Sequence, residues 1–181
     1  MLRLPCFTHT LQLVVSDGFK ESKCTKAAMT KVSSIARCVH KSTAMTERLD
    51  QDAFCIPIPL VTRCNSQYYT AAKIIQTPSD KLNENLRELK KDSLVLSQRD
   101  LAILNEFVSV FAMFAEACST RAQAAQAASI SLVGPSLLEI NFDLESKRTT
   151  LKYNCDLRIA LIKLISRAFR WVIGRAWLNY R

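Results

Sequence analysis

Residues 97–118 read SQRDLAILNEFVSVFAMFAEAC, and this stretch predicts a long amphipathic helix. Ser97, followed three residues later by Asp100, has the spacing of a capping box, in which two side chains bond the first N–H groups of a helix. Apolar or small residues then recur at alternating intervals of three and four, which places them on one helical face: Leu101, Leu104, Val108, Phe111, Ala115 and Cys118. We interpret this face as core packing.

The same period recurs along the rest of the chain, with apolar or small residues at positions 28, 32, 35, 39, 42, 46 and 49 and again at Val133, Leu137, Ile140 and Leu144. We expect further helices at residues 8–19, 25–49, 62–75, 79–89, 133–144 and from 156 to about 177. The alternating prolines of Ile56-Pro57-Ile58-Pro59 predict an extended linker. Thr62, and Ser79 or Asp80, are the expected N-caps of two of these helices. With only three glycines and no useful run of alternating polarity, the sequence predicts an all-α fold of six or seven helices.

The composition fits one globular domain. The chain has 181 residues, of which 49% are hydrophobic, enough to build a core. No uninterrupted apolar run approaches the roughly twenty residues that span a bilayer, and no apolar segment with a cleavage site opens the chain. We therefore expect neither a transmembrane helix nor a secretory signal.

Seven cysteines raise the question of a metal site. Their number is odd, their spacing is irregular, and no Cys-x-x-Cys pair occurs. Cys6 and His9 form one close pair, but His40 is the only other histidine, and a zinc site needs four converging ligands. We interpret most of the cysteines as buried thiols in a reducing compartment, and we predict no metal and no cofactor.

Several segments resemble one family, in the family's own order. Cys6-Phe7-Thr8-His9-Thr10-Leu11-Gln12-Leu13 resembles the Cys-x-x-His-x-Leu-x-Leu segment of hAT-superfamily transposases and of the BED-type zinc-finger proteins domesticated from them. Thr62-Arg63-Cys64-Asn65-Ser66 resembles the family's Thr-Arg-Trp-Asn-Ser motif, with Cys64 in place of tryptophan. Residues 97–118 and 130–144 resemble two further helices. The resemblance fades after residue 154, which gives a transposase-like helical region at 1–154 and a divergent basic C-terminal helix at 155–181.

The resemblance implies the helical insertion region of an RNase H-like transposase without its catalytic sheet. The family's catalytic aspartates precede the Cys-x-x-His segment and its glutamate lies well downstream, so we expect an internal fragment with no catalytic residue and no enzymatic activity. Arg63 and Asn65 are the DNA-binding residues that it implies, whereas Cys64 cannot stack on a base as tryptophan would. Cys6 and His9 are expected to be structural. The implied location is the nucleus, or otherwise the cytoplasm.

Charge is distributed in blocks: residues 1–91 carry +6, residues 92–146 carry −5, and residues 147–181 carry +8. Basic helices suit phosphate backbones, although solvated basic faces are common in soluble proteins. The family resemblance favours DNA, bound weakly and without sequence preference. The residues expected to contact phosphate are Lys31, Arg37, Lys41, Arg167 and Arg170.

The sequence is also compatible with two alternatives to DNA binding: a protein-interaction or oligomerisation module, and a truncated gene product without an independent function. Separated from a sheet, the first helix is expected to expose Phe7, Leu11 and Val14, which would promote self-association. The basic tail with both tryptophans fits a membrane surface, nucleic acid or the protein core. We favour a divergent end without a selected role.

Overall fold

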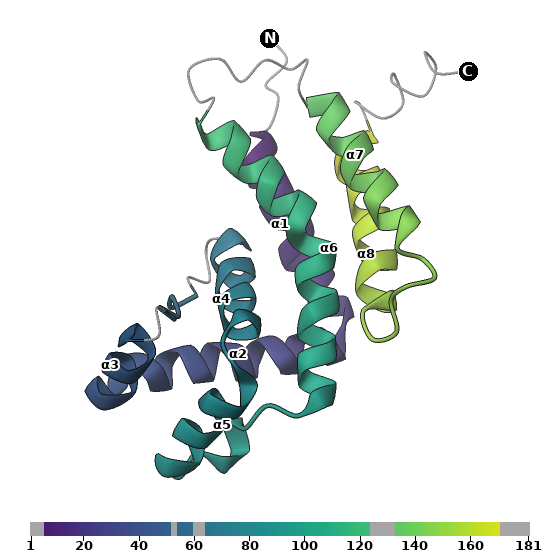
Figure 1. Cartoon of the computed structure of the whole chain (residues 1–181). Helices are drawn as coiled ribbons and strands as arrows, with labels where there is room; N and C mark the ends of the chain where they lie inside the picture. Colours follow the sequence, from purple (N-terminus) through teal and green to yellow (C-terminus); the bar gives the residue numbers. More distant parts are fainter. Residues whose placement is uncertain (1–5, 52–53, 60–63, 124–132, 171–181) are drawn as a thin grey trace. The chain divides into compact units, whose positions relative to one another are not determined.

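The computed structural model describes residues 6–51, 54–59, 64–123 and 133–170. These residues form eight α-helices and one 3-10 turn, with no strand among them, so the predicted all-α fold is confirmed (Figure 1). The elements are α1 (Phe7–Glu21), α2 (Lys23–Lys41), α3 (Thr43–Gln51), α4 (Cys64–Gln76), α5 (Ser79–Glu88), η1 (Asp92–Leu94), α6 (Gln98–Gln123), α7 (Val133–Ser146) and α8 (Cys155–Ala168).

The count exceeds the prediction by one helix because the segment 25–49 is two helices that meet at Ser42. The hydroxyl of Ser42 accepts a hydrogen bond from the N–H of Met45 at 3.3 Å, as an N-cap does, and so starts α3. The N–H of Ser42 still bonds the carbonyl of Val39 at 3.1 Å, which closes α2. Val39 and Leu49 are both buried, so the apolar spacing continues across the break.

The chain divides into two compact units, one formed by Met1–Ser22 with Val110–Arg181 and the other by Lys23–Ser109. Helix α6 contributes residues to both units. The division predicted at residue 154 described the extent of the family resemblance, and it stays a prediction.

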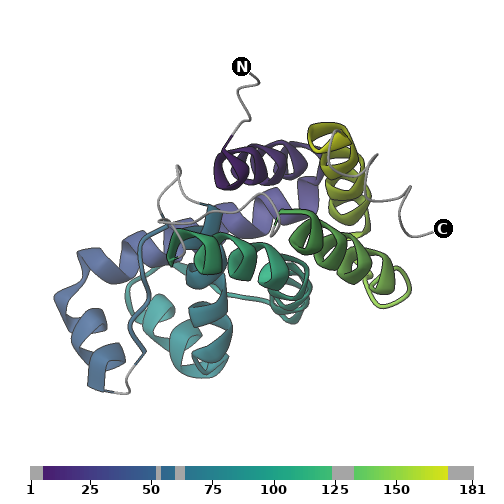
Figure 2. The ribbon, with the colours of Figure 1, turned by 90° about the horizontal axis from the view of Figure 1, so that it is seen from above.

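In the first unit, α1 packs along α8 (Figure 2). Gly18 permits a close approach, since a Cβ atom placed there would lie 2.8 Å from Cδ2 of Leu161. Leu11 and Val14 are 0% and 3% exposed. The prediction of an uncovered first helix is therefore wrong, because α8 covers the face that was expected to need a sheet.

Helix α7 presents its predicted stripe to the interior of the same unit. Val133, Leu137, Ile140 and Leu144 are all buried, as expected. The C-terminal end of α7 is closed by Arg158 of α8, whose buried guanidinium donates to the carbonyl of Leu144 at 3.3 Å. An arginine at this position satisfies a terminal carbonyl and complements the negative end of the helix dipole.

In the second unit, α2 packs against α3, α4 and η1. Its buried face includes Ala28, Val32, Ile35 and Val39, the stripe expected from the sequence. The predicted extended segment is held between two helices: the Nε2 atom of His40 lies 2.7 Å from the carbonyl oxygen of Ile56, and Thr70 donates to the carbonyl of Pro57 at 3.0 Å.

The buried side chain of Asn83 joins α5 to the start of α6. Its amide nitrogen donates to the carbonyl of Leu96 at 3.0 Å, and its amide oxygen accepts from the N–H of Leu96 at 2.8 Å. The side chain thus pairs with a backbone as a neighbouring strand would, which fixes the chain just before the helix starts.

Helix α6 begins with the predicted capping box. The hydroxyl of Ser97 accepts from the N–H of Asp100 at 3.1 Å, and a carboxylate oxygen of Asp100 accepts from the N–H of Ser97 at 2.9 Å. The core face is rotated from the predicted one, because Leu101 and Val108 are only half-buried while Phe107 and Phe114 are 1% exposed.

The predicted cap of α5 is wrong. Ser79 is the first residue of α5 and not its cap; the N-cap is Pro78, which makes no side-chain capping bond.

Within the described residues, one helical window, Gln98–Ser119, is long and apolar enough to cross a membrane by composition alone. Half of that window is buried inside the protein, and core helices of soluble proteins pass the same test.

Candidate nucleic-acid interface

The outward side of α2 carries a row of cations. Lys23, Lys26, Arg37 and Lys41 are all exposed, and no Asp or Glu occurs anywhere in the helix. Thr30 and Ser34 occupy the positions between them at intervals of three and four. These six residues, 23, 26, 30, 34, 37 and 41, form what we call the α2 stripe. At 1.5 Å of rise per residue, the stripe is about 27 Å long.

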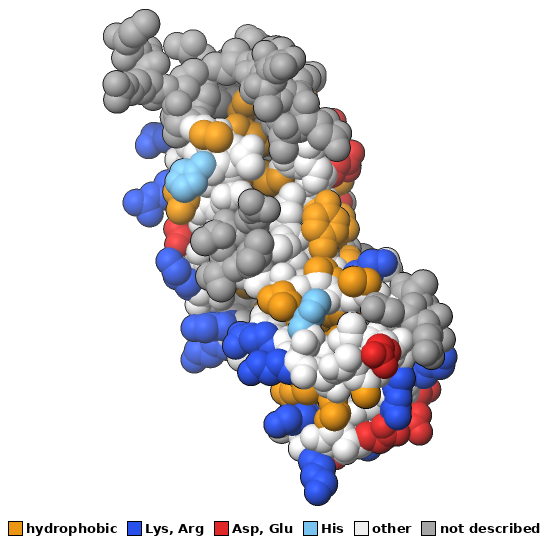
Figure 3. All heavy atoms as spheres, turned by 90° about the vertical axis from the view of Figure 1, so that its left-hand side faces the viewer, with side chains coloured by type: hydrophobic (Ala, Val, Ile, Leu, Met, Phe, Trp, Pro, Cys, Tyr) orange, Lys and Arg blue, Asp and Glu red, His pale blue; other side chains and the backbone are white. Residues whose placement is uncertain are grey.

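The middle of the α2 stripe is made of short hydroxyl side chains that are turned back onto the helix. Thr30 donates to the carbonyl of Lys26 and Ser34 to the carbonyl of Thr30, each at 2.9 Å. Because these side chains are small and bonded to their own backbone, the cations on either side of them project furthest into solvent. Figure 3 shows exposed Lys and Arg side chains projecting from the surface of the protein.

Lys31 does not belong to this stripe. Its ammonium is 2.7 Å from Asp100 Oδ2 and 2.6 Å from the carbonyl oxygen of Val95, and only 21% of its side chain is exposed. The prediction that Lys31 contacts phosphate conflicts with this geometry, since the charge is already neutralised inside the unit.

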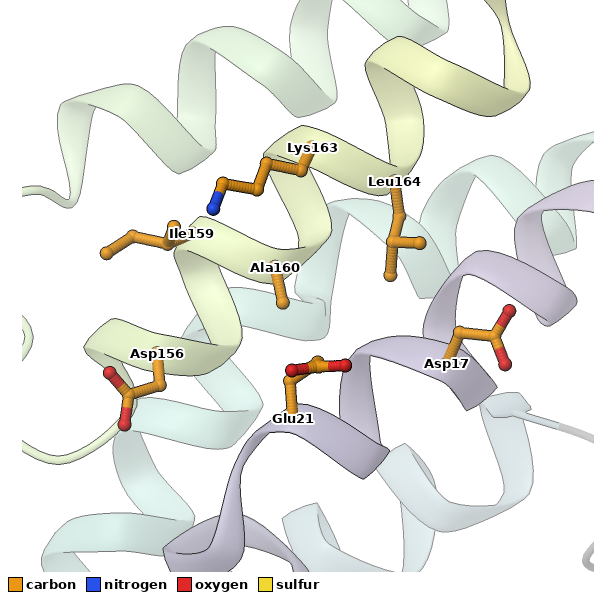
Figure 4. Close-up of a pocket in the computed structure, with 7 residues that line it drawn as sticks. All are labelled: Asp17, Glu21, Asp156, Ile159, Ala160, Lys163 and Leu164. Atoms are coloured by element: carbon orange, nitrogen blue, oxygen red, sulfur yellow. The ribbon is translucent and has the colours of Figure 1, made fainter.

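The other unit exposes a second set of basic side chains on and just beyond α8. Arg167 and Arg170, both expected from the sequence, are exposed, and Lys163 lies one turn before Arg167. Lys163 also borders a hollow of about 430 Å³ between α8 and α1 (Figure 4). Asp17, Glu21 and Asp156 line the same hollow, and Asp17 is paired with Lys20 at 2.6 Å. This unit therefore mixes acids with its cations, unlike the α2 stripe.

Those residues of the two family-like motifs that the structure describes lie at the beginnings of helices. Cys6 precedes α1, where its carbonyl accepts from the N–H of Thr10 at 2.9 Å, and the side chains of Cys6 and His9 are both exposed. Asn65 is half-buried in the first turn of α4. Arg63 lies outside the described residues, as do the side chain of Cys64 and the expected cap Thr62.

The cysteines are more exposed than predicted. Of the six whose side chains the structure describes, Cys118 is buried, Cys38 and Cys155 are half-buried, and Cys6, Cys24 and Cys55 are exposed. Within the described ranges, no three His, Cys, Asp or Glu side chains come together in a group that could hold a metal ion.

A scan against protein-family models, a search of curated proteins and a search of solved structures each found no match to this chain. The candidate interface therefore rests on the residues themselves.

Sequence reasoning missed Lys23 and Lys26 as members of the interface, although the signal was present. No acid occurs from residue 22 to residue 46, a span that includes the whole of α2. The helical period also indicates that Lys31 faces the core. It lies four residues before the buried Ile35, on the same side of α2.

Proposed function

We propose that this chain binds DNA through the phosphate backbone, without sequence preference and without cleaving it, as a nuclear protein derived from a hAT-type transposase. The observation that carries the proposal is the α2 stripe, which has four exposed cations and no acid on its helix. The cations form two pairs, Lys23 with Lys26 and Arg37 with Lys41, one near each end of the helix, so both ends of the stripe can meet phosphates, and each such contact releases counterions from the DNA.

The chemistry of the stripe also supports weak, nonspecific binding. Lysine is a point charge on a flexible stem and contacts phosphate without reading bases, and three of the four cations are lysines. Phosphate contacts position a protein on a duplex but carry no direct sequence information. Affinity of this kind lies at roughly 10⁻⁴–10⁻⁶ M at physiological salt.

The family resemblance supplies the ancestry and the nuclear location in this proposal. It also adds Arg63 and Asn65, which flank the first residue of α4, as further DNA contacts. The proposal leaves out strand cleavage, since neither the sequence reading nor the resemblance gives this segment a catalytic residue.

Labelled duplexes of two unrelated sequences, titrated with the protein at several salt concentrations, test the proposal. We expect equal affinities for the two sequences and a steep, parallel loss of binding as salt rises. Tight, salt-resistant binding to one sequence would contradict it. So would metal-dependent nicking of a supercoiled plasmid by the purified protein.

A further inference from the structure

Helix α4 carries an exposed tyrosine in a row of polar side chains. Asn65, Tyr69 and Lys73 follow one another at intervals of four, and Gln76 continues the same face. Tyr69 is 47% exposed, although tyrosine rings bury readily. Lys73 and Gln76 are exposed as well. This face thus presents an aromatic ring with a cation one turn away.

The helix beneath Tyr69 is firmly placed, so the ring stands on a rigid support. Ala71 and Ile74, on the opposite side of α4, are fully buried. Thr70 is also buried, and its bond to Pro57 ties α4 to the extended segment. The neighbouring Tyr68 meets Tyr69 edge to face, with ring centroids 5.3 Å apart. That contact restricts the ring of Tyr69 while nearly half of the side chain stays in solvent.

The surroundings of Tyr69 favour a negatively charged partner. Helix α4 contains no acidic residue, and neither does α2, which packs against it. A contrasting exposed ring occurs on α7, where Phe142 is 76% exposed. That helix has the acidic residues Glu139, Asp143 and Glu145 and no basic residue of its own. Lys147 pairs with Asp143 and Arg158 with Glu145, so α7 itself offers no cation next to the ring that could pair with a phosphate.

We propose that the face of Asn65, Tyr69 and Lys73 binds single-stranded DNA, with an unpaired base stacked on the ring of Tyr69 and a neighbouring phosphate paired with Lys73. Every base has a π face, so stacking tolerates any sequence, and a duplex hides those faces within its own stack. This site deepens the proposed DNA binding and rests on it. It adds a preference for unpaired strands that the α2 stripe does not supply.

Fluorescence anisotropy with labelled dT20, U20 and a 20-base-pair duplex tests the site on the full chain. Tyr69→Ala should weaken dT20 binding about fivefold or more, the effect of losing one stacked base, and leave duplex binding within about twofold. Tyr69→Phe keeps the ring and should bind dT20 as the wild type does. Phe142→Ala, which removes an exposed ring from the acidic helix, should change neither affinity. Circular dichroism checks that each variant keeps its helices.

The outcomes separate this site from the proposed duplex binding. Wild-type affinity of Tyr69→Ala for dT20 would overturn the site while duplex binding stands, and an equal loss for dT20 and the duplex would overturn it too. A loss confined to U20 would assign the ring to RNA and overturn the proposal. Absence of binding to any of the three oligonucleotides by the wild type would instead remove the proposed function itself.

Discussion

The ammonium of Lys31 lies 2.7 Å from a carboxylate oxygen of Asp100, although the two residues are 69 positions apart in the chain. Both side chains are mostly shielded from solvent, with 21% and 23% of their surface exposed. The same carboxylate oxygen accepts from the N–H and the hydroxyl of Ser97 in the cap of α6. Lys31 therefore joins the middle of α2 to the first turn of α6 within one compact unit.

Breaking this pair should destabilise the protein more than breaking an exposed one. We expect Lys31→Met to lower the free energy of unfolding by about 1–2 kcal/mol, because it leaves a shielded carboxylate and the carbonyl of Val95 without their charged donor. Arg48→Met is the matched control: its pair with Glu88 is more than half exposed on both sides, and such pairs contribute about 0–1 kcal/mol. Urea unfolding followed by circular dichroism measures both. Equal losses would contradict a special role for Lys31.

The pair also predicts an acid-sensitive contribution to stability. Partial burial alone would raise the pKa of Asp100, but the hydrogen bonds from Lys31 and Ser97 outweigh it and hold the pKa below its ordinary value of 3.8. As pH falls the unfolded chain takes up this proton first, so the contribution is present above about pH 4 and is lost as pH falls through the lower folded pKa. The stability difference between wild type and Asp100→Asn should therefore be larger at pH 6 than at pH 3. A difference that does not change with pH would contradict the assignment.

Local patterns in the sequence predicted the parts of the fold that depend on neighbouring residues. The Ser97 cap and the buried stripes of α2 and α7 need only residues within a few turns, and the structure contains all three. The break at Ser42 could not be predicted because the apolar spacing continues across it. Contacts between residues far apart in the chain, such as that of Lys31 with Asp100, could not be predicted from local patterns either.

The same limit applies to the candidate site. Arg37 and Lys41 are exposed as expected, because their positions follow from the period of α2. Lys31 was misassigned because its partner Asp100 belongs to another helix. Tyr69 lacked a signal of its own, since a tyrosine in an amphipathic helix is usually packed, and only its exposure in the structure distinguishes it.

The two serines expected as N-caps should now differ in their effect on stability. Ser97→Ala removes the hydroxyl that accepts from the N–H of Asp100 and donates to its carboxylate, and we expect a loss of about 1 kcal/mol. Ser79→Ala should change stability by less than about 0.5 kcal/mol, since Pro78 holds the cap position of α5 and no side-chain capping bond forms there. Thermal unfolding of the two variants side by side checks the pair. A comparable loss in Ser79→Ala would restore the cap that the sequence suggested.

The packing of α1 on α8 depends on the small size of Gly18. A Cβ at this position would approach Leu161 to 2.8 Å and Leu157 to 3.5 Å, so Gly18→Val must displace a leucine in a filled core. Overpacking of this kind costs about 1–3 kcal/mol. Ser16→Val introduces the same side chain at an exposed position of α1 and should have little effect. If Gly18→Val has the same free energy of unfolding as the wild type, α8 does not pack closely against α1 at this position.

The salt dependence of DNA binding distinguishes the α2 stripe from net charge alone. Each lost phosphate contact should make the slope of log affinity against log salt shallower by about 0.9, so Arg37→Gln with Lys41→Gln should lower it by about 1.8. The matched double variant is Lys20→Gln with Arg48→Gln, which removes two exposed cations that are paired with Asp17 and Glu88. It has the same net charge but leaves the stripe intact, and it should keep the wild-type slope. If the salt dependence becomes shallower by the same amount in both double variants, overall charge determines DNA binding, and the stripe is not the interface.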